Sequence, residues 1–223
     1  MTAGFGKSVP FALVASFELW LARTSTTPWS TALLAWAGVA TGWVAMAYLL
    51  GRPGMLLKAR GGLWVLAPFT LFAAGIARAA RRLGVTESSQ VAPGLWVGGW
   101  PLRRTPIDAQ FDCTAELPRR GRSTLYACEP MLDGVPVPGA KLRAAIAQVR
   151  EWRSAGRSVL LHCAYGHGRS VAVACAVMVL DGDAVDAPDA LRRIRELRPG
   201  ARLDPGQRAA IEDAIRGLRQ APP

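Results

Sequence analysis

The sequence lacks the patterns that mark several common classes of protein. It has no zinc-ligand spacing, no aromatic RNA-binding motif and no nucleotide-binding P-loop of the GxxxxGKS or GxxxxGKT kind. Four cysteines occur in 223 residues, and they include no CxxC pair. These absences argue against a nucleic-acid-binding protein. They also indicate a reducing compartment, because the C-terminal part is long enough to form a core without disulfides.

Acidic residues are nearly absent from the first 84 positions. This part contains eight Lys and Arg but a single acid, Glu18, whereas residues 85–223 contain 19 basic and 15 acidic residues. The whole chain is 51% hydrophobic and has a formal net charge of +11. Because the excess positive charge accompanies the more apolar part, the composition is typical of a membrane protein and not of a soluble nucleic-acid-binding domain.

No charged residue occurs from Thr24 to Gly51, and the apolar run over residues 30–50 is long enough to span a bilayer, which requires about 20 residues. A second run near residues 63–79 is predicted as a tilted or kinked span, a re-entrant segment or an interfacial segment. For a third run over residues 9–22 the alternatives are a span, an amphipathic surface helix or a signal peptide, although no cleavage-site pattern follows it. We therefore expect residues 1–84 to form a membrane-anchoring region with two or three transmembrane or membrane-associated helices.

The cysteines indicate better than the charges on which side of the membrane the C-terminal domain lies. Basic residues on the two sides of the second run nearly balance, so the positive-inside rule does not decide between the orientations. Free cysteines favour a reducing environment. The expectation is an integral protein of the plasma (inner) membrane whose C-terminal domain faces the cytoplasm.

Beyond residue 84 the apolar runs become shorter, charges interleave with them, and turn residues separate them. Strands are predicted over residues 94–101, 110–118, 123–130 and 158–162, and the last is a continuous apolar run of the kind buried on both faces. Helices are predicted over residues 141–156, 170–180, 189–197 and 205–218, and the second of these must be central because it is apolar all round. Strands with interposed helices predict an α/β domain over residues 85–223.

The motif HCAYGHGRS, residues 162–170, lies between the predicted buried strand and the predicted buried helix. A turn from strand into helix is where backbone N–H groups and the positive end of a helix converge on an anion, and its two glycines permit the backbone conformations that this requires. The motif therefore predicts a phosphate site whose binding residues are Ala164, Tyr165, Gly166, His167, Gly168 and Arg169.

The remaining side chains of the motif fit nucleophilic chemistry. Cys163 lies where its thiolate is favoured over its thiol, which makes it a nucleophile. Arg169 offers a planar fork of donors that matches two phosphoryl oxygens. Ser170 is placed to donate a hydrogen bond to the sulfur, and His162 is expected to orient the loop.

Spacing alone does not carry this prediction. Cys113 and Arg119 have the same separation, and arginine is common in this sequence, so such pairs arise by chance. The second pair encloses no glycine, contains Pro118, and places Glu116 where a phosphate would be repelled. Cys163 alone is also preceded by His, followed by Gly three positions later, and followed by Ser directly after the arginine.

The motif resembles the HCxxGxxRS or HCxxGxxRT signature of the cysteine-dependent protein tyrosine phosphatases, especially the compact dual-specificity branch. The resemblance extends over about residues 91–219. VAPGLWVGGWP is similar to the opening strand of that branch, EPMLDGVPVP to the loop that carries its general acid, and LRRIRELRPGARLDPGQ to its closing helix pair. The resemblance implies a dual-specificity-phosphatase-like central sheet flanked by helices.

The resemblance also implies a two-step hydrolysis of phosphomonoesters. Cys163 attacks phosphorus to give a phosphocysteine while an acid protonates the leaving oxygen, and the same acid, now a base, then activates water. Asp133 is the candidate acid and Glu129 the alternative. No metal or other cofactor is implied, because Arg169 and the backbone N–H groups supply the charge stabilisation. In some relatives a cysteine on the strand that corresponds to Cys113 forms a reversible disulfide with the nucleophile; the alternative is a small buried apolar residue.

Three functions remain open at this point. The first is a membrane-anchored protein phosphatase, the second a phosphatase of the same mechanism that acts on a lipid phosphate, such as a phosphoinositide or phosphatidylglycerol phosphate, and the third a non-catalytic phosphate-binding pseudophosphatase. Phosphoinositide-directed relatives often carry Lys or Arg inside the loop, whereas this loop has Ala164, Tyr165 and His167. The expected partners are a phosphorylated protein or phospholipid and the membrane, and no nucleic acid.

Overall fold

The structure is a computed structural model of the chain, and it describes residues 3–56, 64–84, 87–101, 107–120 and 123–220. The chain divides into two compact units, residues 1–76 with 115–118 and residues 77–114 with 119–223. This division falls after Ile76, inside a helix, and the boundary after residue 84 stays a prediction from the sequence. In the second unit, the guanidinium of Arg78 lies 5.5 Å from the ring centroid of Trp100, so the last turns of that helix pack with the C-terminal domain.

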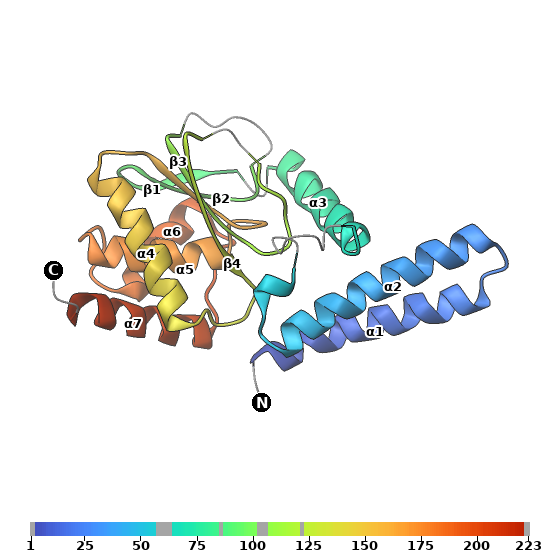
Figure 1. Cartoon of the computed structure of the whole chain (residues 1–223). Coiled ribbons are helices and arrows are strands. Elements are labelled where there is room, and N and C mark those ends of the chain that lie inside the picture. Colours follow the sequence, from blue (N-terminus) through green and yellow to red (C-terminus); the bar gives the residue numbers. More distant parts are fainter. Residues whose placement is uncertain (1–2, 57–63, 85–86, 102–106, 121–122, 221–223) are drawn as a thin grey trace. The chain divides into compact units, whose positions relative to one another are not determined.

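In the first unit, helices α1 (Ala3–Thr24) and α2 (Pro28–Leu49) form a hairpin (Figure 1). Thr27 caps α2, its side chain accepting a hydrogen bond from the Ser30 N–H, and Pro28 occupies the first turn. The helices approach closely, since a Cβ added to Gly38 would lie 2.7 Å from Cγ of Leu19. Large apolar side chains point outward along both helices and are exposed, among them Leu13, Phe17, Trp20, Trp29, Leu33 and Trp43.

Both helices of the hairpin are long and apolar enough to cross a bilayer. The run at residues 30–50 corresponds to α2, and the run at residues 9–22 lies inside α1. The run near residues 63–79 forms α3 (Ala67–Arg82), which has 16 residues. At 1.5 Å per residue α3 is about 24 Å long, which is shorter than the roughly 30 Å of bilayer hydrocarbon.

The connection from α2 to α3 turns back along α2. It contains the short 3-10 helix η1 (Pro53–Met55), and the Trp43 indole N–H donates to the Met55 carbonyl at 2.8 Å. Further along the chain, the Trp36 indole N–H donates to the carbonyls of Trp64 and Val65, each at 3.1 Å. The beginning of α3 is therefore fastened to α2 by backbone acceptors.

The second unit holds a five-stranded sheet with the order β1-β2-β5-β3-β4 (Figure 1). The strands are β1 (Ser89–Ala92), β2 (Leu95–Gly98), β3 (Ala109–Thr114), β4 (Leu125–Met131) and β5 (Val159–His162). β1 runs antiparallel to β2, and every other neighbouring pair is parallel. β5 occupies the centre and is buried at each of its residues, as its apolar sequence predicts.

Besides the end of α3, four helices occur in the described residues of this unit. Helices α4 (Gly139–Ser154) and α5 (Arg169–Leu180) pack against the sheet, while α6 (Ala187–Leu197) and α7 (Pro205–Gln220) pack against α5 (Figure 1). α5 is buried from Arg169 to Val179, which confirms that this apolar segment is central. Gly156, two residues after the end of α4, has a φ of +72°. A glycine in this conformation is a common helix stop, as the sequence predicts for this position. The α/β class predicted from the sequence is confirmed.

The parallel strands bring the chemistry to one edge of the sheet. The carboxyl ends of β2, β5, β3 and β4 meet there because these strands are mutually parallel. The loop at residues 163–168 leaves β5 at this edge, and the loop at residues 132–138 leaves β4 there. The sequence did not predict β1, since this strand has only four residues, three half-buried and one exposed, and no clear apolar-polar alternation.

Candidate active site

The loop at residues 163–168 places a thiol and a guanidinium at its two ends. Cys163 follows the last residue of β5 and is 2% exposed, and Arg169, the first residue of α5, is also 2% exposed. The Cys163 sulfur accepts hydrogen bonds from the Gly166 N–H at 3.2 Å and from the Ser170 hydroxyl at 3.4 Å. The loop therefore curls around the sulfur and returns to it at the start of α5.

The carbonyl groups of this loop are bound from outside it. The Trp100 N–H donates to Ala164 O at 3.1 Å, the Arg198 guanidinium to Tyr165 O at 3.2 Å and Gly166 O at 3.1 Å, and the Arg202 N–H to His167 O at 2.8 Å. In a planar trans peptide the N–H points away from the C=O of the same unit. The N–H groups of the next residues therefore turn toward the interior of the loop, which is the arrangement of an anion-binding nest.

Gly166 has a backbone conformation that the loop cannot obtain from another residue. Its φ is +74°, and a Cβ added there would lie 2.6 Å from both the Gly98 carbonyl oxygen and Nη2 of Arg198. Glycine has no Cβ and populates positive φ without steric cost. The glycine that the sequence motif singled out is therefore required by conformation and by the close approach of β2.

Arg169 is held in place from the neighbouring loop. Its Nη1 donates to the Met131 carbonyl at 3.1 Å, and its Nε lies 3.3 Å from Oδ1 of Asp133. Asp133 stands in the loop after β4 with a side chain that is 55% exposed. The structure thus places Cys163, Arg169, Ser170 and Asp133 together at the carboxyl edge of the sheet.

His162 is buried behind the nucleophile. Nε2 of His162 lies 2.7 Å from Nε2 of Gln110, and Nδ1 of His162 lies 3.9 Å from Oδ1 of Asp112. An amide Nε2 can only donate, so it supplies the hydrogen of this bond, and the ring accepts at Nε2. Both partners belong to β3, so the residue before Cys163 is fixed to the adjacent strand, which fits the orienting role expected of it.

Solved phosphatase structures resemble this arrangement. Human DUSP28 aligns with a TM-score of 0.52 and 19% identity over 58% of this chain and 96% of that chain. DUSP15 aligns with a TM-score of 0.52 and 24% identity over 60% of this chain and 90% of that chain. A mutant form of Tk-PTP gives a TM-score of 0.53 and 20% identity, covering 60% and 98% of the two chains. The chain has the dual-specificity phosphatase fold.

At this level of identity the likeness concerns the phosphatase fold itself. No protein-family profile matches the sequence, and no curated protein matches it. The expected fold, a dual-specificity-phosphatase-like sheet flanked by helices and preceded by apolar helices, is confirmed. What the site does must be argued from its own residues.

The surroundings of the Cys163 thiol lower its pKa below the ordinary value. Burial by itself raises the pKa, because it disfavours the charged thiolate. The positive charge of Arg169 and the hydrogen bonds from the side chain and backbone of Ser170 outweigh burial, and the Asp133 carboxylate opposes them. In contrast, burial raises the pKa of Cys175, in the middle of α5, to about 12. Within the phosphatase fold, the loop thus favours the thiolate form of this buried thiol more than burial alone would allow.

Replacing Ser170 with Ala should raise the pKa of Cys163, because it removes one hydrogen bond to the thiolate. The thiolate is the reactive form, so its rate of alkylation by iodoacetamide rises with pH through the pKa. The variant should therefore show the midpoint of this rise at higher pH than the parent chain. Ser154→Ala, which removes a hydroxyl bonded to the Glu151 carbonyl on α4, is the control and should not move the midpoint. A midpoint that stays fixed or falls in Ser170→Ala contradicts the assignment.

Glu129, the alternative acid, does not join the site. It lies on β4, and its Oε1 accepts from Lys141 Nζ at 2.9 Å. The second cysteine-arginine pair also fails to form a cradle. Cys113 is buried on β3, whereas the Arg119 guanidinium lies 4.2 Å from the ring centroid of Tyr126. The structure therefore distinguishes the two pairs in the way that the glycines and the histidine predicted.

Sequence reasoning missed Arg198. This buried residue follows α6, and its single guanidinium binds the Tyr165 and Gly166 carbonyls and also the Glu87 carbonyl. Burial lowers the pKa of Arg198, and the negative charge of Cys163 offsets part of this effect. Arg198 is a positioning residue, because it turns two carbonyls away from the interior of the loop. The sequence signal was an arginine directly before Pro199-Gly200, in the segment that resembles the closing helix pair.

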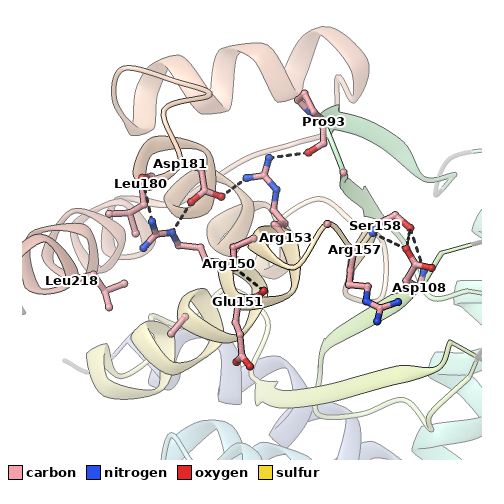
Figure 2. A pocket seen from close by; sticks show the side chains of 14 residues that line it. Pro93, Asp108, Arg150, Glu151, Arg153, Arg157, Ser158, Leu180, Asp181 and Leu218 are labelled. Carbon is pink, nitrogen blue, oxygen red and sulfur yellow. Dashed lines mark hydrogen bonds and ion pairs between the residues drawn. The ribbon is translucent and has the colours of Figure 1, made fainter. Parts of the chain in front are cut away.

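A hollow without any residue of the phosphate loop lies at the opposite edge of the sheet. It has a volume of about 1050 Å³ and includes Gly94, Asp108 and Ser158, which precede β2, β3 and β5 (Figure 2). Two of its arginines are paired with aspartates: Arg150 Nε lies 2.6 Å from Asp181, and Arg153 binds Asp181 and Asp183. These ion pairs fasten the end of α4 to the segment after α5. The hollow holds no residue of the HCAYGHGRS motif, so we do not assign chemistry to it.

Proposed function

We propose that this chain is a membrane-anchored phosphomonoester hydrolase of the tyrosine or dual-specificity type, and that it works through a phosphocysteine intermediate. The observation that carries the proposal is the loop after β5, where outward-bound carbonyls turn the N–H groups inward around Cys163 and Arg169. A phosphoryl group in this loop meets a thiolate, a guanidinium fork and backbone donors together.

In the first step the Cys163 thiolate attacks phosphorus in line with the leaving oxygen. The S–P bond forms, the P–O bond to the substrate breaks, and Asp133 gives its proton to the departing alkoxide or phenoxide. In the second step Asp133 takes a proton from water as the water oxygen attacks phosphorus. The S–P bond then breaks, the electron pair returns to sulfur, and the hydrogen bond from Ser170 stabilises the departing thiolate. Arg169 and the loop N–H groups hold the phosphoryl oxygens throughout.

Asp133→Asn should reduce kcat about 10²-fold for phenyl phosphate, because the amide cannot protonate a poor leaving group. The loss should be smaller for para-nitrophenyl phosphate, whose leaving group needs less protonation. Glu129→Gln is the matched control, since Glu129 is paired with Lys141 and should cost little activity. If Glu129→Gln loses the larger factor, or if the loss in Asp133→Asn does not depend on the leaving group, the acid has been assigned to the wrong residue.

Cys113 is proposed as a redox partner of the nucleophile. Burial raises the pKa of its thiol, and the negative charge of Cys163 raises it further, so the two sulfurs interact. Hydrogen peroxide would oxidise the Cys163 thiolate to a sulfenic acid, and the Cys113 thiol would then attack that sulfur and release water. Peptide mass spectrometry after peroxide treatment should show a Cys113–Cys163 disulfide in the parent chain. Overoxidation of Cys163 without this disulfide contradicts the proposal.

The hairpin of α1 and α2 is proposed as the anchor, and its geometry indicates the orientation. Antiparallel helices return the chain to the side on which it began, so Lys7 and Arg52 stand near one end and Arg23 near the other. Because α3 is too short to cross again, the positive-inside rule places the second unit in the cytoplasm, at the plasma (inner) membrane. Protease should digest this unit in inverted membrane vesicles and leave it intact in right-side-out vesicles; the opposite pattern reverses the orientation.

The substrate is proposed to be a phosphoprotein, with a single-phosphate lipid as the alternative that the anchor favours. The decisive test is turnover by the full chain in detergent micelles with phosphotyrosine and phosphothreonine peptides, phosphatidylglycerol phosphate and a phosphoinositide. Phosphate release from any of these that stops in Cys163→Ser supports the hydrolase. If none is hydrolysed, and para-nitrophenyl phosphate is not hydrolysed either, the loop is a phosphate-binding module without catalysis.

A further inference from the structure

Helix α3 has two unlike faces. Thr70, Ala74 and Ala77 are buried, at spacings of four and three residues. Leu71 and Phe72, in contrast, are each 68% exposed, and Ile76 and Leu83 are also exposed. At 100° per residue the four large apolar side chains fall within an arc of about 140°. The helix therefore presents a largely apolar face outward, which Arg82 joins in the last turn, while Thr70, Ala74 and Ala77 are covered.

The charge around this face has one sign. The last turn of α3 carries Arg81 and Arg82, and α3 has no acidic residue. In the sequence, no Asp or Glu occurs between Glu18 and Glu87, although seven Lys and Arg do. An apolar helical face bordered by basic residues fits an anionic bilayer surface, where acyl chains receive the apolar side chains and phosphates receive the cations.

The position of α3 in the first unit also favours a lipid surface over a protein partner. The ring of Phe69, on α3, meets Phe11 of α1 edge-on at 5.9 Å, and Trp36 of α2 binds the backbone at Trp64, just before α3. The helices that it joins are the two with the length and composition of membrane spans. Trp64 is itself exposed, as expected of an indole at the membrane–water boundary.

We propose that α3 lies in the plane of the membrane interface, with Leu71, Phe72 and Ile76 among the acyl chains and the exposed Arg82 against anionic phospholipid headgroups. The proposal uses the anchoring part of the proposed function and is independent of the catalytic step. It also connects the bilayer to the active site within the second unit. Arg78 of α3 stacks on Trp100, whose N–H binds the Ala164 carbonyl of the phosphate loop. Two contacts thus separate the interfacial helix from the loop.

The test compares the accessibility of two introduced cysteines in the full chain. Phe72→Cys places a thiol on the proposed lipid face, and Val185→Cys, 81% exposed in the segment before α6, is the matched control. Each variant is reconstituted into vesicles of phosphatidylcholine and phosphatidylglycerol at a ratio of about two to one and treated with a water-soluble maleimide. Peptide mass spectrometry measures the labelling of each introduced cysteine separately from that of the native cysteines. Position 72 should react at least about tenfold more slowly than position 185.

The possible outcomes distinguish a failure of the interfacial helix from a failure of the proposed membrane anchor. Flotation of the vesicles reports the anchor: a chain that does not float contradicts both the anchor and the interfacial helix. A chain that floats but is labelled equally fast at positions 72 and 185 contradicts the interfacial helix alone. In vesicles of pure phosphatidylcholine the protection at position 72 should weaken at least about threefold, because Arg82 loses its anionic partners. Equal protection in both lipids contradicts the preference for anionic headgroups.

Discussion

Cys163→Ser should lower kcat for para-nitrophenyl phosphate by at least about 10⁴-fold, because removal of a nucleophile eliminates the covalent pathway. The surroundings of position 163 stabilise a thiolate through Arg169 and Ser170, but a serine hydroxyl stays protonated at the same pH. The loop itself should persist, since its carbonyls are bound by Trp100, Arg198 and Arg202 and not by the sulfur. Inorganic phosphate should therefore still bind to the variant.

The matched control for this change is Cys128→Ser, a half-buried cysteine on β4 that takes no part in the proposed reaction. It should keep activity within about twofold of the parent chain, since an isosteric change on a partly exposed strand costs little. If Cys163→Ser retained more than about one hundredth of the parent activity, the nucleophile would have to be another group. A loss of activity in both variants would indicate a loss of folding, which circular dichroism would report.

Arg169→Lys should lower kcat about 10³-fold, the second largest loss expected from a single change. The guanidinium is held by the Met131 carbonyl and by Asp133, and in the proposed reaction its fork binds the phosphoryl oxygens. A lysine ammonium keeps the charge but cannot offer two parallel donors to two phosphoryl oxygens, and the loss of one such donor costs about 10² to 10³-fold. The loss should appear mainly in kcat, because the transition state concentrates charge on those oxygens.

Arg193→Lys provides the control for this substitution. Arg193 is exposed on α6 and pairs with Asp189 at 3.0 Å, so the change should leave kcat unaltered. An Arg169→Lys variant within about tenfold of the parent chain would show that a point charge suffices. The bidentate arrangement at the start of α5 would then have no catalytic role.

Local patterns predicted much of the second unit. The segment VLLH is apolar at successive positions, and the structure buries it at the centre of the sheet; RSVAVACAVMVL is apolar all round, and it forms the buried helix α5. The two glycines of the motif were expected to permit the backbone conformations of an anion-binding nest, and Gly166 has a positive φ. These features depend on a few neighbouring residues, so they can be predicted from the sequence without knowledge of the fold.

The features that the sequence did not reveal depend on distant partners. Arg198 acts on the carbonyls of Tyr165 and Gly166, more than 30 residues earlier in the chain. Its place before Pro199-Gly200 marks the end of a helix but does not indicate these contacts. Apolar composition alone could not separate a span from an interfacial helix near residues 63–79. The length of α3 and the alternation of Thr70, Ala74 and Ala77 with exposed Leu71 and Phe72 became visible in three dimensions.

Covalent capture of the intermediate tests most directly whether sulfur and guanidinium share one phosphate cradle. The parent chain is mixed with para-nitrophenyl phosphate, quenched in acid after milliseconds, and digested for mass spectrometry. The peptide with Cys163 should carry the added mass of one phosphoryl group, and this mass should be absent from Cys163→Ser. Steady turnover with no phosphoryl group on Cys163, or with one on another residue, would contradict the assignment of this loop as the catalytic centre.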